Sequence, residues 1–200
     1  MTLLGLIRHG ATAWNQAGRI QGRADIPLSG RGRGDFEGLG PPPGLDGAAW
    51  VSSPLRRATE TAQLLGADEL RTEPRLIEMD WGAWEGRTLA ELRDELGPAM
   101  RENEDRGLDF TPPRGESPRD VQTRLAPWLR EVGRAKTPTV AVTHKGVIRA
   151  VFALALGWDM IGRPPVRLEW VCAHLFVLDG GGEVRAERFN EPLVRRGEPR

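Results

Sequence analysis

Two histidines each follow closely on a short strand-like segment of the sequence. His9 comes after Leu3–Ile7 with Arg8 between them, and His144 comes directly after Thr139–Thr143. A neutral imidazole can attack an electrophilic phosphorus atom and form a phosphohistidine. Guanidinium groups beside it would hold the phosphoryl oxygens, and a carboxylic acid would protonate the leaving oxygen. These residue types point to phosphoryl transfer. The alternative is that His9, Arg8 and His144 are hydrogen-bonded structural groups.

The segments before the two histidines predict strands of a sheet with both faces covered. Leu3–Ile7 and Thr139–Thr143 are short and largely apolar, and Ala49–Ser52 is a shorter candidate strand. In sheets of parallel strands, ligands bind just beyond the carboxyl ends of the strands. His9 and His144 are therefore expected at the edge of the sheet where a site forms.

Helices are predicted between these strands. Leu55 to Leu65 has apolar residues at helical spacing, and Ser117 followed by Pro118 is a helix-start signal. A further helix is expected from about Val147 until Gly157, and the segments Val171–Leu178 and Glu183–Phe189 read as a terminal hairpin. The alternation predicts an α/β fold with a mostly parallel sheet.

Length and composition set the limits for the whole chain. The 200 residues suit one domain spanning 1–200, with residues 190–200 expected to be a loosely held tail. The 28 Lys and Arg balance the 28 Asp and Glu, which argues against a nucleic-acid partner or an anionic membrane. The longest apolar run, Ala150–Trp158, is far below the ~20 residues that cross a bilayer. With Cys172 as its single cysteine, the chain is expected to be a cytoplasmic protein.

Five ordered motifs of the sequence resemble those of one enzyme family. They are LIRHGATAWN at 6–15 with its continuation at 19–29, SSPLRRATETA at 52–62, LIEMDWGAWEG at 76–86, PRGES at 113–117 and VTHKGVIR at 142–149. Together they resemble the histidine phosphatase superfamily, also called the phosphoglycerate mutase-like family. The resemblance implies a three-layer α/β sandwich in which helices flank a mostly parallel central sheet.

The resemblance also implies a role for each matching residue. His9 would accept the phosphoryl group, and Arg8, Arg57 and His144 would bind its oxygens. Glu78 would protonate the leaving group and later assist the attacking water. No metal ion and no other cofactor would be needed, because arginines supply the positive charge.

Other positions match family residues that line the pocket and do not take part in the reaction. Asn15, Gln21 and Gly22 match residues that line the phosphate pocket and its rim, and Trp81 is a candidate substrate contact. Asp80 and Glu85 are rivals of Glu78 as the acid, and the residues alone leave the three nearly equal.

Two departures from the family pattern bear on the reaction. Lys145 stands where most relatives have glycine, and its ammonium would either reach an additional anionic group of the substrate or extend into water. Glycolytic mutases carry a lysine and a pair of arginines at the positions of Leu89 and Asp105–Arg106.

Two of these three cations are missing here, and their loss favours hydrolysis of a small phosphorylated metabolite over mutase activity. A phosphoglycerate mutase and a non-catalytic phosphate-binding module are the alternatives. The sequence leaves a monomer and a homodimer equally open.

Overall fold

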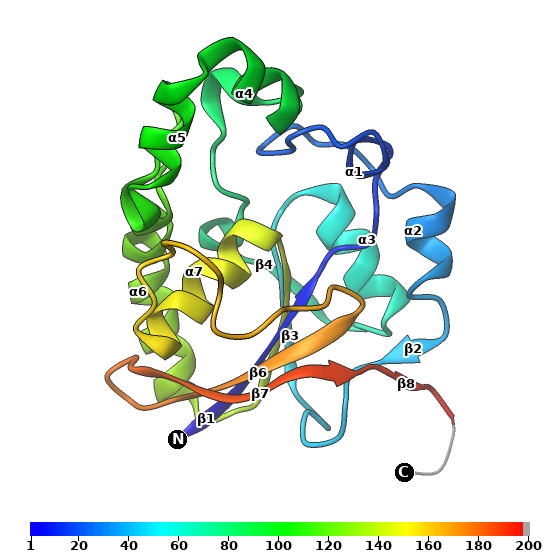
Figure 1. Cartoon of the computed structure of the whole chain (residues 1–200). Helices are drawn as coiled ribbons and strands as arrows, with labels where there is room; N and C mark the ends of the chain where they lie inside the picture. The colour runs from blue at the N-terminus through cyan, green and yellow to red at the C-terminus, as the bar shows by residue number, and fades with distance from the viewer. Residues whose placement is uncertain (198–200) are drawn as a thin grey trace.

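A six-stranded mixed sheet forms the centre of the protein, in a computed structural model that describes residues 1–197 (Figure 1). Its strand order is β4-β3-β5-β1-β6-β7, in which β4, β3, β5 and β1 are parallel, β6 is antiparallel to β1, and β7 is antiparallel to β6. A second, two-stranded sheet pairs β2 with β8. The strands are β1 Thr2–Arg8, β2 Leu39–Gly40, β3 Ala49–Ser52, β4 Leu70–Thr72, β5 Thr139–Thr143, β6 Cys172–Leu178, β7 Val184–Pro192 and β8 Val194–Arg195.

Helices cover both faces of the sheet. α6 and α7 pack on one face in a core that includes Leu4, Leu6 and Phe176, and α3 packs on the other face with Val140 and Val142. The helices are α1 Ala13–Gln16, α2 Gly30–Gly34, α3 Arg56–Leu64, α4 Leu89–Leu96, α5 Pro98–Glu104, α6 Pro118–Ala135 and α7 Lys145–Leu156, with short 3₁₀ turns at η1 Pro74–Leu76, η2 Gly82–Trp84 and η3 Gly107–Asp109. The predicted three-layer α/β architecture is confirmed.

The local signals of the sequence correspond to real boundaries. Ser117 caps α6 through the main-chain N–H of Asp120, and the Asp120 carboxylate accepts from the main-chain N–H of Ser117 in return. β3 and β5 have the predicted bounds. α7 begins at Lys145, two residues before the predicted start, so that His144 is its N-cap residue.

The expected loose tail is corrected by the strand pairing. β7 continues to Pro192, and Val194–Arg195 then pairs with Leu39–Gly40 of the surface loop. Leu193 packs against the core on the α3 face, and this apolar contact anchors the segment. The remainder of the expected tail, residues 198–200, lies outside the described residues.

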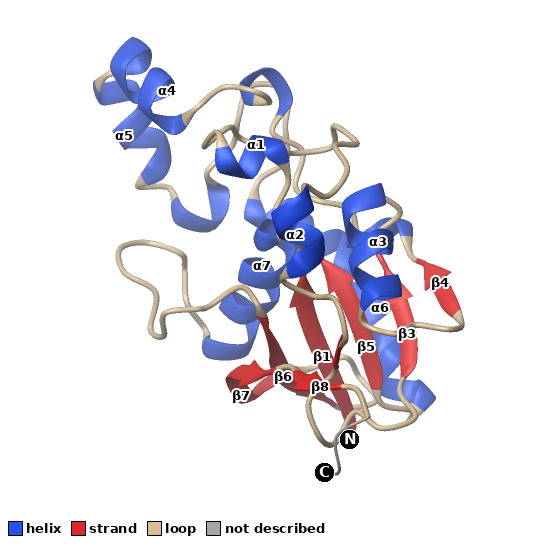
Figure 2. Ribbon diagram, turned by 90° about the vertical axis from the view of Figure 1, so that its right-hand side faces the viewer, coloured by secondary structure: helices blue, strands red, loops and turns tan. Residues whose placement is uncertain are grey.

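The parallel strands β1 and β5 determine where the candidate site lies. β1 and β5 are neighbours in register, with Arg8 opposite Thr143, so His9 and His144 leave the sheet side by side. α1, α4 and α5 lie beyond this carboxyl end, away from the chain termini (Figure 2). No helix within residues 1–197 is both long and apolar enough to span a membrane.

Candidate active site

His9 is held with one ring nitrogen satisfied and the other directed at a guanidinium group. Its main-chain N–H donates to the Thr143 carbonyl at 2.9 Å, which fixes the residue at the end of β1. Nδ1 lies 2.7 Å from the Gly10 carbonyl oxygen, so Nδ1 carries the proton and donates. Nε2 is then unprotonated, and its lone pair accepts a hydrogen bond from Arg57 Nε at 3.3 Å. Burial and the charges of Arg8 and Arg57 hold the pKa of His9 well below its ordinary value, so the ring is neutral at pH 7.

Arg57 is fully buried at the start of α3, whereas its neighbour Arg56 is exposed. The Arg57 guanidinium donates to the carbonyls of Gly22 and Ala24, each at 2.7 Å. Burial lowers the pKa of Arg57 to about 10, which still leaves it charged at neutral pH. These two bonds fix the guanidinium plane against the 22–24 loop with its Nε–H at His9.

His144 lies next to His9, with the two ring centroids 5.1 Å apart. The side chain is fully buried, and its Nε2 lies 2.7 Å from Ser53 Oγ at the end of β3. Burial, followed by the charge of Arg57, holds the pKa of His144 well below its ordinary value. The second histidine is thus also a neutral group beside the first.

The structure places the three rival carboxylates in different surroundings. Glu78 is buried, and this burial raises its pKa. Asp80 is instead paired with Arg23 at 3.1 Å, and Glu85 accepts from the main-chain N–H groups of Gly22 and Ala24. A raised pKa suits an acid that must hold a proton at neutral pH, so the surroundings of Glu78 match the role that the resemblance gives it.

The Glu78 carboxylate is fixed from two elements of the fold. It accepts from the main-chain N–H of Met79 at 2.8 Å and from that of Gly146, in the first turn of α7, at 3.2 Å. A Cβ atom at Gly146 would collide with Glu78 Oε1, so glycine is needed there for the close approach. The arrangement couples the acid to the helix that follows His144.

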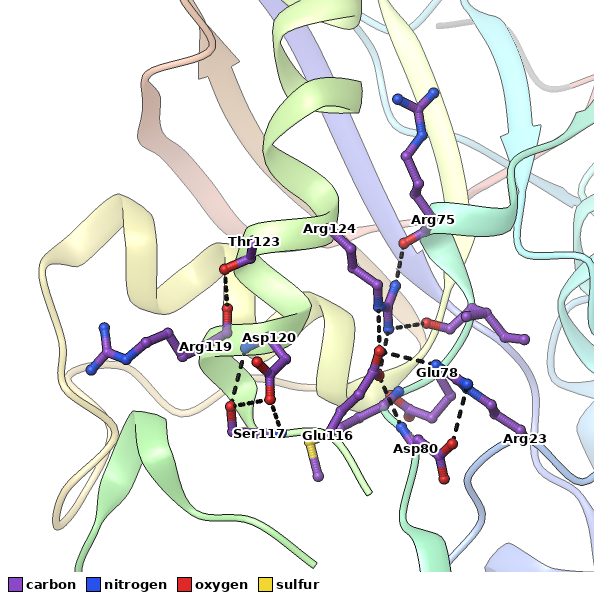
Figure 3. Close-up of polar contacts among 12 residues, drawn as sticks. Arg23, Arg75, Glu78, Asp80, Glu116, Ser117, Arg119, Asp120, Thr123 and Arg124 are labelled. Atoms are coloured by element: carbon purple, nitrogen blue, oxygen red, sulfur yellow. Dashed lines mark hydrogen bonds and ion pairs between the residues drawn. The ribbon is translucent and has the colours of Figure 1, made fainter. Parts of the chain in front are cut away.

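Arg124 on α6 anchors the segment that carries Glu78 (Figure 3). Its guanidinium donates to the main-chain carbonyls of Arg75 and Ile77, the latter at 2.7 Å, and pairs with Glu116 at 3.2 Å. The partly buried Arg124 guanidinium therefore attaches the segment just before Glu78 to the long helix α6. The resemblance assigned no role to Arg124.

Glu116 closes this network on the far side of Glu78. It accepts from the main-chain N–H of Asp80 at 3.1 Å and pairs with Arg23, which also binds the Asp80 carboxylate. These contacts give Glu116 a structural role. Residues on both sides of Glu78 are thus held to the start of α6.

We expect Arg124→Met to lower the free energy of unfolding by about 2–4 kcal/mol, because two main-chain carbonyls and Glu116 lose a partly buried donor. A displaced Glu78 should also lower kcat/KM, which reports phosphorylation of His9, by about tenfold on an alkyl phosphate and by less on p-nitrophenyl phosphate, whose leaving group needs no proton. Urea unfolding and the kcat/KM ratio of the two substrates measure both effects. Arg130→Met, an exposed change on the same helix, is the control. An unchanged kcat/KM ratio would leave Arg124 a purely structural residue.

A cavity of about 720 Å³ opens over these groups. Seven of the predicted site residues line it: Arg8, His9, Asn15, Gln21, Glu78, Trp81 and Lys145. Arg57, His144 and Gly22 are not part of its wall. Arg57 contacts His9, the His144 ring lies beside the His9 ring at an interplanar angle of 59°, and the Gly22 carbonyl accepts from Arg57. All ten predicted residues therefore belong to one connected region.

Three buried side-chain nitrogens in this region have no hydrogen-bond partner within residues 1–197. They are Arg8 Nε, Gln21 Nε2 and His144 Nδ1, and they are the whole set of such buried atoms in the described chain. An unpaired buried polar group costs about 1–3 kcal/mol, so a cluster of them indicates a ligand rich in acceptor oxygens. A phosphoryl group is such a ligand.

A sequence model described as the histidine phosphatase superfamily (branch 1) matches residues 4–191. This chain belongs to the histidine phosphatase superfamily. The membership confirms the resemblance carried by the five motifs and the predicted enzyme class.

Individual relatives of this histidine phosphatase are phosphatases of small molecules. A glucosyl-3-phosphoglycerate phosphatase of Mycolicibacterium vanbaalenii is 34% identical over 178 residues, covering 78% of this chain and 77% of the relative. Phosphoserine phosphatase 1 of Hydrogenobacter thermophilus is 32% identical over 168 residues, covering 80% and 79%. A crystal structure of an Entamoeba histolytica phosphoserine phosphatase with 3-phosphoglyceric acid has a TM-score of 0.79 at 29% identity, covering 96% of this chain and 98% of that one.

Sequence reasoning missed several residues of this histidine phosphatase site. Arg149, which the motifs did not single out, lines the cavity with Lys145, one helical turn earlier on α7. Its spacing from Lys145 was the signal that would have found it. Ser53 and Arg124 act through His144 and the Glu78 segment, and neither carries a sequence signal that separates it from an ordinary core or surface residue.

The buried neutral histidines predict that this phosphatase loses stability in mild acid. The pKa values of His9, His144 and His174 are all lowered by burial, that of His174 to about 4. Below pH 6.5 the unfolded chain binds these protons and the folded chain does not, so each histidine lowers the free energy of unfolding by about 1.4 kcal/mol per pH unit. Glu78, with its raised pKa, opposes this by at most one proton.

We therefore expect a net loss of about 3 kcal/mol per pH unit just below pH 6, measured by urea unfolding between pH 8 and pH 5. The surface carboxylates with lowered pKa values titrate below this window. A free energy of unfolding independent of pH across it would contradict the burial of neutral histidines.

Proposed function

We propose that this histidine phosphatase is a metal-independent phosphomonoesterase that hydrolyses a small phosphorylated metabolite through a phosphohistidine on His9. The observation that carries the proposal is a neutral His9 with an unprotonated Nε2, close to three buried side-chain nitrogens that have no hydrogen-bond partner within residues 1–197. Nε2 attacks phosphorus, so that the P–N bond forms as the bond to the leaving oxygen breaks.

Arginines would neutralise the phosphoryl charge. Arg8 carries an unpaired buried Nε, and Arg57 Nε–H points at the atom that makes the attack. Both guanidinium groups can therefore donate to phosphoryl oxygens as negative charge builds up on them. Gln21 Nε2 and His144 Nδ1 would supply further donors.

Glu78 would serve both halves of the reaction. Burial raises its pKa and so favours the protonated form, which gives its proton to the leaving oxygen of the substrate. The resulting carboxylate then takes a proton from a water molecule, whose oxygen attacks phosphorus and breaks the P–N bond. Inorganic phosphate leaves, and His9 and protonated Glu78 are restored.

The cavity wall favours hydrolysis over mutase activity. Leu89 and Asp105, which stand where a glycolytic mutase carries cations, both line the cavity. An apolar and an acidic side chain at these places would not retain a phosphoglycerate between two phosphoryl transfers. The relatives named above are correspondingly phosphatases, of glucosyl-3-phosphoglycerate and of phosphoserine.

The proposal is tested by phosphate release from a panel of sugar phosphates, phosphorylated amino acids and phosphoglycerates, with and without a metal chelator. Brief exposure to a ³²P-labelled substrate should leave an acid-labile, base-stable label on His9. Turnover without such a label removes the covalent route. With 3-phosphoglycerate, isomer formation faster than phosphate release would favour the mutase. Binding of phosphate esters without release from any of them would favour a non-catalytic module.

A further inference from the structure

Three cations of the cavity wall rest on two tryptophan rings. The Arg8 guanidinium carbon lies 5.1 Å from the centroid of Trp170, and Lys145 Nζ lies 5.7 Å from the same ring. The Arg149 guanidinium carbon lies 5.3 Å from the centroid of Trp158. Contacts of this kind hold a cation in place without neutralising its charge.

No carboxylate in the described part of the chain forms an ion pair with these cations, although Glu78 interacts electrostatically with Arg8 and Lys145 over a longer distance. Within residues 1–197, Arg8, Lys145 and Arg149 form no ion pair and no side-chain hydrogen bond, whereas Arg93 at the same cavity is paired with Glu104 at 2.6 Å. Lys145 remains open to solvent, yet the protein around its ammonium and the charges of Arg8 and Arg149 lower its pKa. Burial likewise lowers the pKa of Arg149. Such a group of like charges is unfavourable until an anion enters the cavity.

The phosphoryl group would not bind all the cations of the cavity wall. Under the proposed function, Arg8 and Arg57 already bind the phosphoryl oxygens beside His9. Lys145 and Arg149 are left over, and they stand four residues apart on α7, where side chains lie one above the other on one face of a helix. Two adjacent cations on one cavity wall match a second anionic group on the same molecule.

We propose that Lys145 and Arg149 bind a second anionic group of the substrate, a carboxylate or a second phosphate, and so select phosphomonoesters that carry one. This inference rests on the proposed function and narrows its substrate class. Lys145 then determines specificity at a position where most relatives have glycine. The ring of Trp170 holds the ammonium group of Lys145 in place through their cation–π contact.

The experiment compares substrates that differ only in the second anion. 3-Phosphoglycerate and glycerol 3-phosphate test a carboxylate, and propanediol bisphosphate and propanediol monophosphate test a second phosphate. Lys145→Met keeps the length of the side chain and removes its charge. We expect the variant to lower kcat/KM by about tenfold, or about 1.4 kcal/mol, for the doubly anionic member of at least one pair, and by less than about twofold for the other member. Arg149→Met should have the same selective effect.

Two further variants make the result specific. Lys136→Met removes the same charge from an exposed residue after α6, beside the amino end of β5, and should leave the ratio within each pair unchanged. Lys145→Arg should restore most of the preference. Turnover of the singly anionic substrates shows that each variant is folded.

The possible failures are distinguishable. If the wild-type protein releases phosphate equally well from both members of each pair, or if Lys145→Met lowers both equally, the second-anion site is wrong and the phosphatase proposal stands. If no substrate releases phosphate, the proposed function itself fails, and the anion site fails with it. A preference in the bisphosphate pair alone would assign the site to a second phosphate rather than to a carboxylate.

Discussion

His9→Ala should abolish phosphate release, lowering kcat by about 10⁴- to 10⁶-fold on every substrate, because no other described side chain can take its place as nucleophile. His144 is next to it, but its Nε2 is held by Ser53, and its Nδ1 is buried. Steady-state phosphate release measures the loss, and the ³²P label should disappear with it. Residual activity within about 100-fold of wild type would contradict the assignment of His9.

The same variant should keep its fold and much of its affinity for phosphate. His9 contributes one side-chain bond to Gly10 and a contact to Arg57, while Arg57 stays attached to Gly22 and Ala24. We expect far-UV circular dichroism to be unchanged and the Kd of inorganic phosphate to rise by less than about tenfold. If the variant lost its fold or all of its phosphate binding, its loss of activity would reflect a disrupted pocket and not the absence of the nucleophile.

The placement of the two histidines could be predicted from the sequence because it follows from local patterns. Short apolar runs before His9 and His144 identify β1 and β5, and parallel strands end at the same edge of the sheet. The same logic gave the start of α6 from Ser117 and Pro118. These features depend on residues that are neighbours in the chain.

The charge environment could not be predicted in this way because it depends on residues that are distant in the chain. The residue types alone leave Glu78, Asp80 and Glu85 nearly equal as candidates for the general acid. Their surroundings differ because they contact Gly146, Arg23 and Gly22, respectively. Likewise, the two outcomes left open for Lys145 depend on Trp170, which is 25 positions further along. Only the folded chain brings these groups together.

The tail from residue 190 was mispredicted for a related reason. The charged and proline-containing end of the sequence has the composition of a loose terminus. Its pairing partner, Leu39–Gly40, lies more than 150 positions earlier, and Leu193 packs against a core formed by residues that are distant in the chain. A long-range pairing of two residues leaves no periodic signal in either segment.

Glu78→Gln should lower kcat by about 10²- to 10⁴-fold on alkyl phosphates, because an amide cannot protonate the leaving oxygen. With p-nitrophenyl phosphate the two roles of Glu78 separate, since p-nitrophenolate departs without a proton. The first step should then stay fast, while release of the phosphohistidine, which needs Glu78 as a base, becomes slow. We expect a burst of about one p-nitrophenol per His9 followed by a slow phase, measured by stopped-flow absorbance.

The two rival carboxylates provide matched controls for this variant. Asp80→Asn removes an ion pair with Arg23, and Glu85→Gln keeps an acceptor for the 22–24 loop, so each should change kcat by less than about fivefold. The amide oxygen introduced by Glu78→Gln can still accept from Met79 or Gly146, which limits the effect of that substitution on the fold. If Asp80→Asn or Glu85→Gln gave the burst instead, the proton would pass through that carboxylate. The raised pKa of Glu78 would then not identify the general acid of the reaction. The burst is the decisive readout because a displaced pocket would slow both steps, whereas the loss of one proton carrier slows only the step that needs it.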